Sequence, residues 1–394
     1  MQANELIKKY QILRFLRQMP TAMVASTYAV FLMGKGLTLA DLGLVGLSFS
    51  VFLLAAELPT GYFADRFGRK KSMIVSGAIT AIAPIIYIWA DSLWQCILAE
   101  LIFATGCGFY NGALDAWIKH ELQCIGKDKS HLQIAGAKGM QAVQIALVVG
   151  ALSGGYLASW NMVVPWIVGG AFNIVLIIAA AMLMRENYQP AEHLPQLGEA
   201  VNLVAKSAAL KFVCALGFIL CFATATTNLY WQPFYAPIAP DPKILGILCF
   251  SFFTVNFIGA KIAEKFFAKN DAQRQEKELV VSHLLIGAAM VAAATVPVFA
   301  VSLLFYIVHE GARGAFMVTR QAYLQAAITK ESQRATIASV GSFFEQAGSI
   351  AAFLISGAML QHGSIANVWL VSGAAAVIAP LLLYQWRKTA RRQE

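Results

Sequence analysis

Apolar segments long enough to cross a membrane, separated by short polar turns, make up most of this sequence. Hydrophobic residues account for 58% of the 394 positions and charged residues for only 13%, whereas a soluble domain carries about 25% charged residues. A run of about 20 apolar residues spans a bilayer as an α-helix. The sequence therefore predicts an all-α polytopic membrane protein.

Twelve transmembrane helices can be placed, six in each half of the chain. In the first half we predict spans at residues 12–33, a segment that ends at 61, 72–90, 94–117, 132–158 and 163–184. In the second half we predict spans at residues 212–235, 244–267, 279–300, 303–326, 335–360 and 366–386. The predicted domains are an N-terminal six-helix bundle (1–184), a cytoplasmic linker (185–211) with a short membrane-surface helix from Leu197 to Ala209, and a C-terminal six-helix bundle (212–394).

Basic residues fall almost entirely on one side of this topology. Only Lys35 and Lys243 lie in loops on the opposite side. Because Lys and Arg resist translocation, we predict a multi-pass protein of the cytoplasmic (inner) membrane with both termini in the cytoplasm. The net charge of +9 follows from this bias, and nucleic-acid binding is not expected, because no basic run comes with base-stacking aromatic residues. The six cysteines show no metal-like or redox-like spacing, so we expect no metal and no other cofactor.

The two halves contain an internal repeat. Residues 139–157 align with residues 341–359, and the alignment places Gly139 on Gly341, Gln144 on Gln346 and Gly155 on Gly357. Two pseudo-symmetric bundles in parallel repeat are the plan of a facilitator-type transporter, with a substrate site near the membrane midplane between the halves.

The most specific motif covers residues 61–71, Gly-Tyr-Phe-Ala-Asp-Arg-Phe-Gly-Arg-Lys-Lys. Asp65 and Arg69 are four residues apart, so one helical turn brings them onto the same face, where they can pair. Gly61 lies one turn earlier and would let another helix approach closely. The pattern resembles the signature loop of the major facilitator superfamily, between its second and third spans, and the whole chain fits the layout of that family.

The resemblance implies a conformational latch. In the family, the loop acid and the second arginine form a charge cluster with an acid at the inner end of the fourth span, and the cluster holds the outward-open state. The residues of this chain that match the latch are Gly61, Asp65, Arg66, Gly68, Arg69 and Asp115. Two departures weaken the match to proton-driven drug exporters: Ala151 replaces the proline common in the fifth span of antiporters, and Ile102 stands near the usual place of an arginine.

Candidates for proton coupling lie inside predicted spans, where each charge costs about 2.5 to 3.5 kcal/mol. Arg313 and Glu345 both fall near the midplane, on the tenth and eleventh spans, and we expect them to pair. A carboxylate whose pairing with arginine changes between states can take up and release a proton, whereas a permanent salt bridge would be structural only. The further candidates are His309, Glu310 and Glu57, the last also able to form a structural pair with Arg17.

Other polar and aromatic residues could line a substrate cavity. The candidates are Tyr28, Tyr110, Gln141, Gln144, Asn228, Trp231 and Asn256. The alternatives for them are interhelical hydrogen bonds and positions facing lipid. Glu100 is expected nearer the outer side, where its side chain can reach water.

These features predict a secondary active transporter that exports an amphipathic small molecule or drug by alternating access, driven by the proton gradient. The alternatives are an importer or facilitator of a small metabolite, and a membrane receptor or scaffold that does not transport. The sequence contains no Gly-x-x-x-x-Gly-Lys-Ser/Thr motif and no catalytic constellation, so we do not expect an enzyme. The expected partners are a small-molecule substrate, protons and bilayer lipid, and we expect a monomer.

Overall fold

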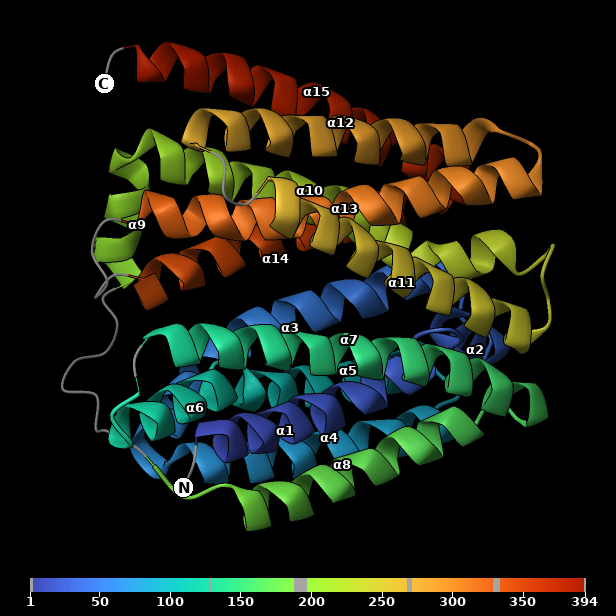
Figure 1. The fold of residues 1–394 in the computed structure, drawn as a ribbon. Helices are drawn as coiled ribbons and strands as arrows, with labels where there is room; N and C mark the ends of the chain where they lie inside the picture. The colour runs from blue at the N-terminus through green and yellow to red at the C-terminus, as the bar shows by residue number, and fades with distance from the viewer. Residues whose placement is uncertain (1–2, 128, 188–196, 268–270, 329–333, 393–394) are drawn as a thin grey trace. The chain divides into compact units, whose positions relative to one another are not determined.

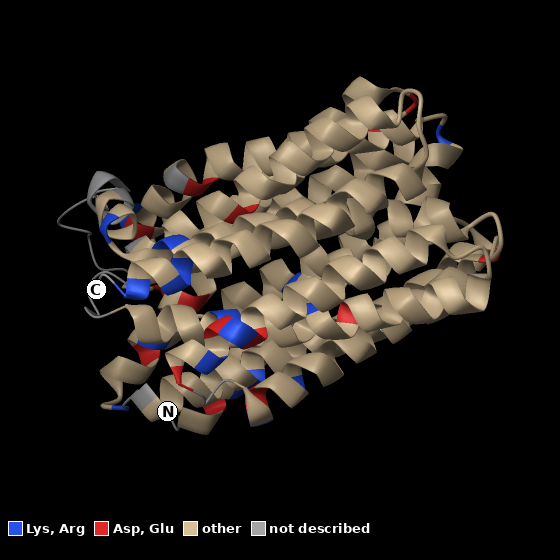
Figure 2. Cartoon of the chain, turned by 90° about the horizontal axis from the view of Figure 1, so that it is seen from above, with Lys and Arg blue, Asp and Glu red and all other residues tan. Residues whose placement is uncertain are grey.

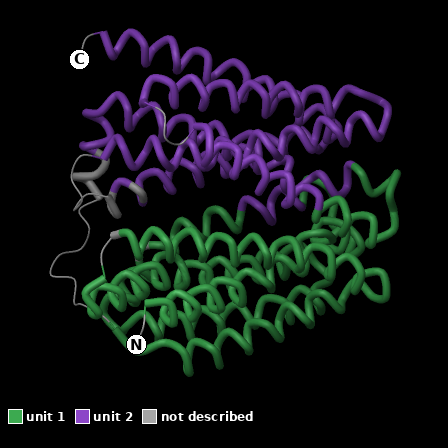
Figure 3. The backbone as a smooth tube through the Cα atoms, viewed as in Figure 1, with its two compact units in different colours: residues 1–41, 48–194, 235–250 green, residues 42–47, 195–234, 251–394 purple. Residues whose placement is uncertain are grey.

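A computed structural model describes residues 3–127, 129–187, 197–267, 271–328 and 334–392. Within these ranges all regular secondary structure is α-helical (Figure 1). Ten segments of the described chain are long and apolar enough to cross a membrane. The chain divides into two compact units: unit 1 is residues 1–41, 48–194 and 235–250, and unit 2 is residues 42–47, 195–234 and 251–394 (Figure 3).

Unit 1 contains the first eight helices, except for residues 42–47 in the third of them, which belong to unit 2. The eight helices are α1 (Ala3–Val24), α2 (Tyr28–Gly34), α3 (Leu39–Phe67), α4 (Arg69–Trp89), α5 (Leu93–Tyr110), α6 (Ala113–Cys124), α7 (Lys129–Trp160) and α8 (Val164–Leu183). A buried core between α1, α4, α6 and α8 is centred on Trp117 and Tyr10, with Leu13 and Met73 packed beside them. Thr38 caps α3 in a capping box with Asp41, which satisfies backbone donors at that helix start.

Two of the predicted spans are interrupted. The first, 12–33, is divided between α1 and α2 by a turn at residues 25–27, and its helix begins at Ala3, well before the apolar segment. The fourth, 94–117, is divided between α5 and α6, where Gly112 has a left-handed φ of 74° that residues other than glycine rarely adopt. Hydropathy reports only the apolar part of a helix, so it detects neither a polar extension nor a break of two or three residues.

Unit 2 contains most of the remaining helices, but residues 242–250 at the start of α11 belong to unit 1. The remaining helices are α9 (Leu197–Lys206), α10 (Ala208–Tyr235), α11 (Pro242–Phe266), α12 (Ala272–Thr295), α13 (Phe299–Ala327), α14 (Arg334–Met359) and α15 (Ile365–Arg391). A short helix is present in the predicted linker as α9, and its position on the membrane surface stays a prediction. Helices α12 and α15 approach closely at Gly287 and Gly373, where an added Cβ on either glycine would meet the carbonyl of the other. Small residues of this kind permit close packing of membrane helices.

Charged side chains are distributed unevenly along the helices. In each unit taken alone, Lys, Arg, Asp and Glu gather toward the helix ends where its chain terminus lies (Figure 2). In unit 1 the other ends carry the exposed tryptophans Trp89, Trp94 and Trp160, which are 80%, 75% and 78% exposed. Tryptophan is enriched where a membrane protein meets the water interface, so we expect these three to lie at that boundary.

A buried carboxylate ties three helices together at the charged end of unit 2. Glu276, near the start of α12, has no exposed surface. Its Oε1 accepts hydrogen bonds from Tyr323 of α13 at 2.7 Å and from Arg387 of α15 at 3.0 Å, and its Oε2 pairs with Arg391. Two arginines and a phenol therefore satisfy one buried negative charge.

We predict that Glu276→Gln destabilises the protein by about 3–5 kcal/mol, because it leaves buried arginine charge without its partner. The measurement is thermal unfolding of the detergent-purified variant. The matched control is Glu264→Gln, which breaks the exposed Lys261–Glu264 pair and should change stability by less than about 1 kcal/mol. Equal melting temperatures for the two variants would contradict this role of Glu276.

Candidate functional site

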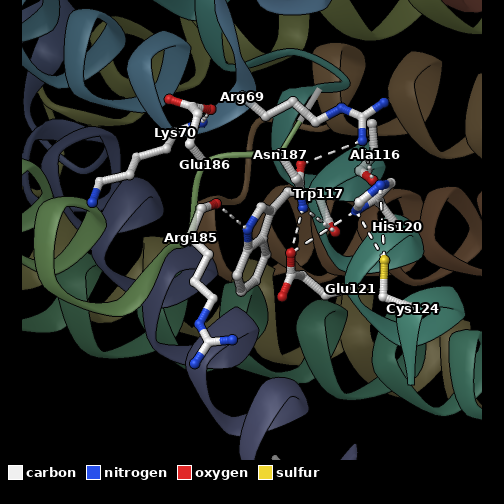
Figure 4. Close-up of polar contacts among 10 residues, drawn as sticks. All are labelled: Arg69, Lys70, Ala116, Trp117, His120, Glu121, Cys124, Arg185, Glu186 and Asn187. Atoms are coloured by element: carbon white, nitrogen blue, oxygen red, sulfur yellow. Dashed lines mark hydrogen bonds and ion pairs between the residues drawn. The ribbon is translucent and has the colours of Figure 1, made fainter. Parts of the chain in front are cut away.

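The signature loop is bonded to the segment that follows α8. The Glu186 carboxylate accepts a hydrogen bond from the backbone N–H of Lys70 at 3.0 Å (Figure 4) and another from that of Lys71 at 3.2 Å. These are donors of the first turn of α4, which has no earlier carbonyl to pair with. A carboxylate at a helix N-terminus also interacts favourably with the helix dipole. Glu186 therefore caps α4 from a distant part of the chain.

Gly68 makes this cap possible. It joins α3 to α4 with φ 111° and ψ 150°, a backbone conformation that is essentially restricted to glycine. A Cβ at this position would also collide with the Glu186 carboxylate. The turn and the cap thus require the same glycine.

Arg69 connects the loop to α6. Its Nη1 donates to the carbonyl of Ala116 at 3.1 Å and to Oδ1 of Asn187 at 3.4 Å (Figure 4). Asn187 in turn donates to Oε1 of Glu121 at 2.7 Å. The indole N–H of Trp117 donates to the carbonyl of Arg185 at 3.1 Å. Residues 185–187, which lie in the predicted cytoplasmic linker, therefore form a polar bridge between α4 and α6.

The two acidic members of the predicted latch have different partners. Asp65 lies near the end of α3. Partial burial raises the pKa of its carboxyl group, and the nearby Arg69 guanidinium offsets only part of this rise. Asp115 is bonded to α1 instead: it accepts from the Tyr10 hydroxyl at 2.5 Å and pairs with Arg14. The structure thus brings Asp65 to Arg69 and Arg69 to the residue after Asp115, while the Asp115 carboxylate itself contacts Arg14. The three-residue cluster stays a prediction for the outward-open state.

The remaining predicted residues of unit 1 occupy several places. Arg66 donates to the Tyr62 hydroxyl at 2.7 Å in an exposed position. Tyr110, a cavity candidate, accepts from Arg14 at 2.9 Å. Gln141 is exposed on α7, Gln144 is half-buried on the same helix, and Glu57 is half-buried on α3. Arg14 was missed at the sequence level, although an arginine inside a predicted span is a signal that could have identified it.

In unit 2 the structure brings five predicted residues together in one cluster centred on Glu310. Glu310 of α13 is 4% exposed. Its Oε1 lies 3.0 Å from Nη1 of Arg313 and 3.5 Å from Nδ1 of His309, and its Oε2 accepts from Asn256 of α11 at 3.3 Å. Arg313 also donates to Asn228 of α10 at 2.6 Å. Two predicted coupling residues and two predicted cavity residues thus surround Glu310. Trp231, another cavity candidate, is buried with its ring 5.2 Å from that of Phe252.

The predicted pairing of Arg313 with Glu345 is corrected by the structure. Glu345 of α14 pairs with Arg320 of α13, with Oε1 2.5 Å from Nη1. Arg313 is already bonded to Glu310 and Asn228. Depth along the helices does not show which side chain of a helix faces a neighbour, and this is why the pairing was predicted wrongly.

Glu100 is also placed differently from the prediction. The expectation that it reaches water is wrong, because Glu100 is only 6% exposed. Its Oε1 accepts from the hydroxyl of the cavity candidate Tyr28 at 2.6 Å and from that of Tyr87.

Apolar spans that carry paired charges inside them define a polytopic membrane carrier, and the comparisons identify its family. The sequence model of the Major Facilitator Superfamily matches residues 12–308. The chain belongs to the Major Facilitator Superfamily, which confirms the resemblance of the signature loop.

The similar proteins are all distant. The chain is 24% identical over 242 residues to the uncharacterized MFS-type transporter YxaM of Bacillus subtilis, covering 59% of each chain. It is 25% identical over 169 residues to the class C tetracycline resistance protein of Escherichia coli, covering 42% of each. The matches thus span about three-fifths and two-fifths of these relatives. Among solved structures, a mutant of the nucleoside transporter NupG superposes with a TM-score of 0.80 at 16% identity, covering 96% of this chain and 98% of the other.

We predict that Gly68→Ala lowers stability by about 1–3 kcal/mol, because it forces a glycine-only conformation onto alanine, and that it also detaches the Glu186 cap. Thermal unfolding of purified protein measures the first effect. Amide hydrogen exchange at the start of α4 measures the second and should become faster.

The control for this prediction is Gly61→Ala, at an ordinary helical position of α3. Alanine favours helix by up to about 1 kcal/mol over glycine, so this variant should be neutral or stabilised. Unchanged exchange in Gly68→Ala would show that the cap does not depend on the glycine.

Proposed function

We propose that the protein is a proton-coupled secondary transporter that exports an amphipathic small molecule by alternating access. In this proposal the chain forms twelve membrane spans in two six-helix bundles (1–184 and 212–394) joined by a cytoplasmic linker. Both termini lie in the cytoplasm and the protein works as a monomer in the inner membrane. The observation that carries the proposal is the Glu345–Arg320 ion pair inside unit 2.

The position of this pair suits a proton-coupling role. Glu345 is the eleventh residue after the first residue of α14, which corresponds to about 17 Å along the helix, roughly half of a bilayer core of about 30 Å. The carboxyl side chain is 28% exposed, whereas that of Arg320 is 8% exposed. A partly exposed acid that pairs with a buried arginine can separate from the arginine and bind a proton instead.

The Glu310 cluster differs in a way that supports a different role. Its carboxylate is bonded to Arg313 and Asn256 and lies against His309. Several donors on one buried carboxylate hold the ionised form and resist protonation. We therefore assign Glu310 to fixing the orientation of Arg313 and Asn228, whose polar groups are candidates for contact with a substrate.

Export is supported by the names of two relatives. One is the tetracycline resistance protein. The other is the efflux pump azaK of Aspergillus niger, which is 25% identical over 155 residues, a match that covers 39% of this chain and 33% of azaK. The arrangement of the chain in two repeats is common to importers and exporters, so import of a metabolite is the alternative outcome of the transport experiment.

We further propose that Asp65 and Arg69 act as a conformational latch together with Asp115. The Asp65 carboxyl lies close to Arg69, which is bonded to the first turn of α6 beside Asp115. A movement that releases Asp115 from Arg14 would free the Asp115 carboxylate to pair with Arg69 instead.

We predict that Glu345→Gln abolishes proton-driven accumulation but retains substrate binding, because glutamine mimics the protonated acid. The measurement uses everted vesicles with and without an imposed pH gradient, with tetracycline and a panel of amphipathic dyes chosen by thermal stabilisation of the purified protein.

The control is Glu264→Gln, which alters an exposed acid of α11 and should transport as the wild type does. Accumulation against the gradient by Glu345→Gln at the wild-type rate would assign Glu345 a structural role. Accumulation in the opposite direction would replace export by import.

We predict that Asp65→Asn reduces transport at least tenfold while leaving the amount of inserted protein unchanged, because Lys and Arg set the orientation. Transport per inserted molecule is compared with that of Asp271→Asn, which weakens only the N-cap of α12. A wild-type rate in the Asp65 variant would exclude the latch.

A further inference from the structure

A buried acid in unit 1 lies outside the proposed coupling site. Glu100 of α5 is 6% exposed inside a candidate membrane span. Its Oε1 accepts hydrogen bonds from two phenols, Tyr28 of α2 at 2.6 Å and Tyr87 of α4. The ring of Trp166 of α8 packs against both, with centroid distances of 6.0 Å to Tyr28 and 4.7 Å to Tyr87. Four helices therefore enclose this carboxyl group.

The second oxygen of Glu100 has a different environment. Oε2 is buried and has no hydrogen-bond partner. Two further buried oxygens without a partner are the hydroxyls of Ser26 and Thr27, on the turn that leads directly into Tyr28. This turn interrupts a membrane span, and irregular backbone at such depth is tolerated only inside protein or beside water.

Glu100 also lacks a cationic partner. Within the described ranges no Lys, Arg or His forms an ion pair with it, whereas the buried acids Glu276 and Glu310 of unit 2 both pair with arginine. The basic side chains Arg17 and Lys35 are bonded to other groups than Glu100. Arg17 donates to Cys107 at 2.9 Å, and Lys35 donates to the carbonyl of Ile88 at 2.6 Å. Cys96, one turn before Glu100 on α5, is buried.

A negative charge in this position would be expensive. A buried carboxylate without a counter-ion costs many kcal/mol, and such a group binds a proton instead. A protonated carboxyl keeps acceptor capacity on one oxygen and carries the proton on the other. This division matches the geometry, because both phenols donate to Oε1 and Oε2 is left for the proton.

We propose that Glu100 is a proton-binding site of unit 1, with the proton on Oε2 and the two tyrosine hydroxyls bonded to Oε1. The reaction is the addition of one proton to the carboxylate, without electron transfer. Loss of the proton leaves a charge held only by phenols of α2 and α4, so the packing of these helices depends on the protonation state. The site is independent of the proposed coupling through Glu345.

The test is infrared spectroscopy of purified protein in lipid nanodiscs, titrated across neutral pH. The C=O stretching band of a protonated carboxyl should be present in the wild type at neutral pH and absent in Glu100→Gln. Tyr28→Phe and Tyr87→Phe should each shift the band to higher frequency, because the C=O group loses one donor. Glu5→Gln, which alters an acid paired with Lys9 at 3.0 Å on the first turn of α1, should leave the band unchanged.

Identical carboxyl bands in the wild type and Glu100→Gln would overturn the proposal, since Glu100 would then be ionised. If Glu100→Gln does not fold, the tyrosine variants decide: an unshifted band in both contradicts the site, and a shift in both supports it. The readout needs no substrate, so failure of the transport experiment leaves this result unaffected.

Discussion

A carboxylate buried among apolar helices must meet a cation or bind a proton, and this constraint organises the polar interior of the protein. The buried Glu276 and Glu310 meet arginines, and so does the partly exposed Glu345. Glu100 meets only phenols. Because lipid and apolar side chains offer no other partner, each of these contacts fixes which helix faces which. Packing of small residues, as at Gly287 and Gly373, then brings the helices close.

At the charged end of each unit, a carboxylate holds two segments of the chain together. In unit 1 a carboxylate after α8, Glu186, binds the start of α4. In unit 2 arginines at the end of α15 bind a carboxylate near the start of α12, Glu276. In each unit the helix of the third predicted span is thus bonded to the chain of the sixth. In unit 1 a carboxylate accepts from backbone N–H groups, whereas in unit 2 arginine side chains pair with a carboxylate.

The sequence was informative about features that depend on residues close together in the chain. The glycines and charges of residues 61–71 identified the family, and the cost of charge in a span identified His309, Glu310, Arg313 and Glu345. It was uninformative about partners far apart in the chain. Arg320 as partner of Glu345, Glu186 as cap of α4 and Tyr87 as partner of Glu100 all depend on helix rotation and on loop paths, which periodicity alone does not determine. Glu276 was missed because the apolar segment begins after it, although its helix begins before it.

The central claim is that exchange of the Arg320 partner for a proton on Glu345 drives transport. The most direct measurement is the pH inside proteoliposomes, followed with an enclosed dye, when a compound selected by thermal stabilisation is added outside. The account predicts that a preset pH gradient collapses in the wild type, and that it persists in Arg320→Gln, where the acid has lost its partner. A gradient that collapses equally in both proteins, or in neither, would contradict it.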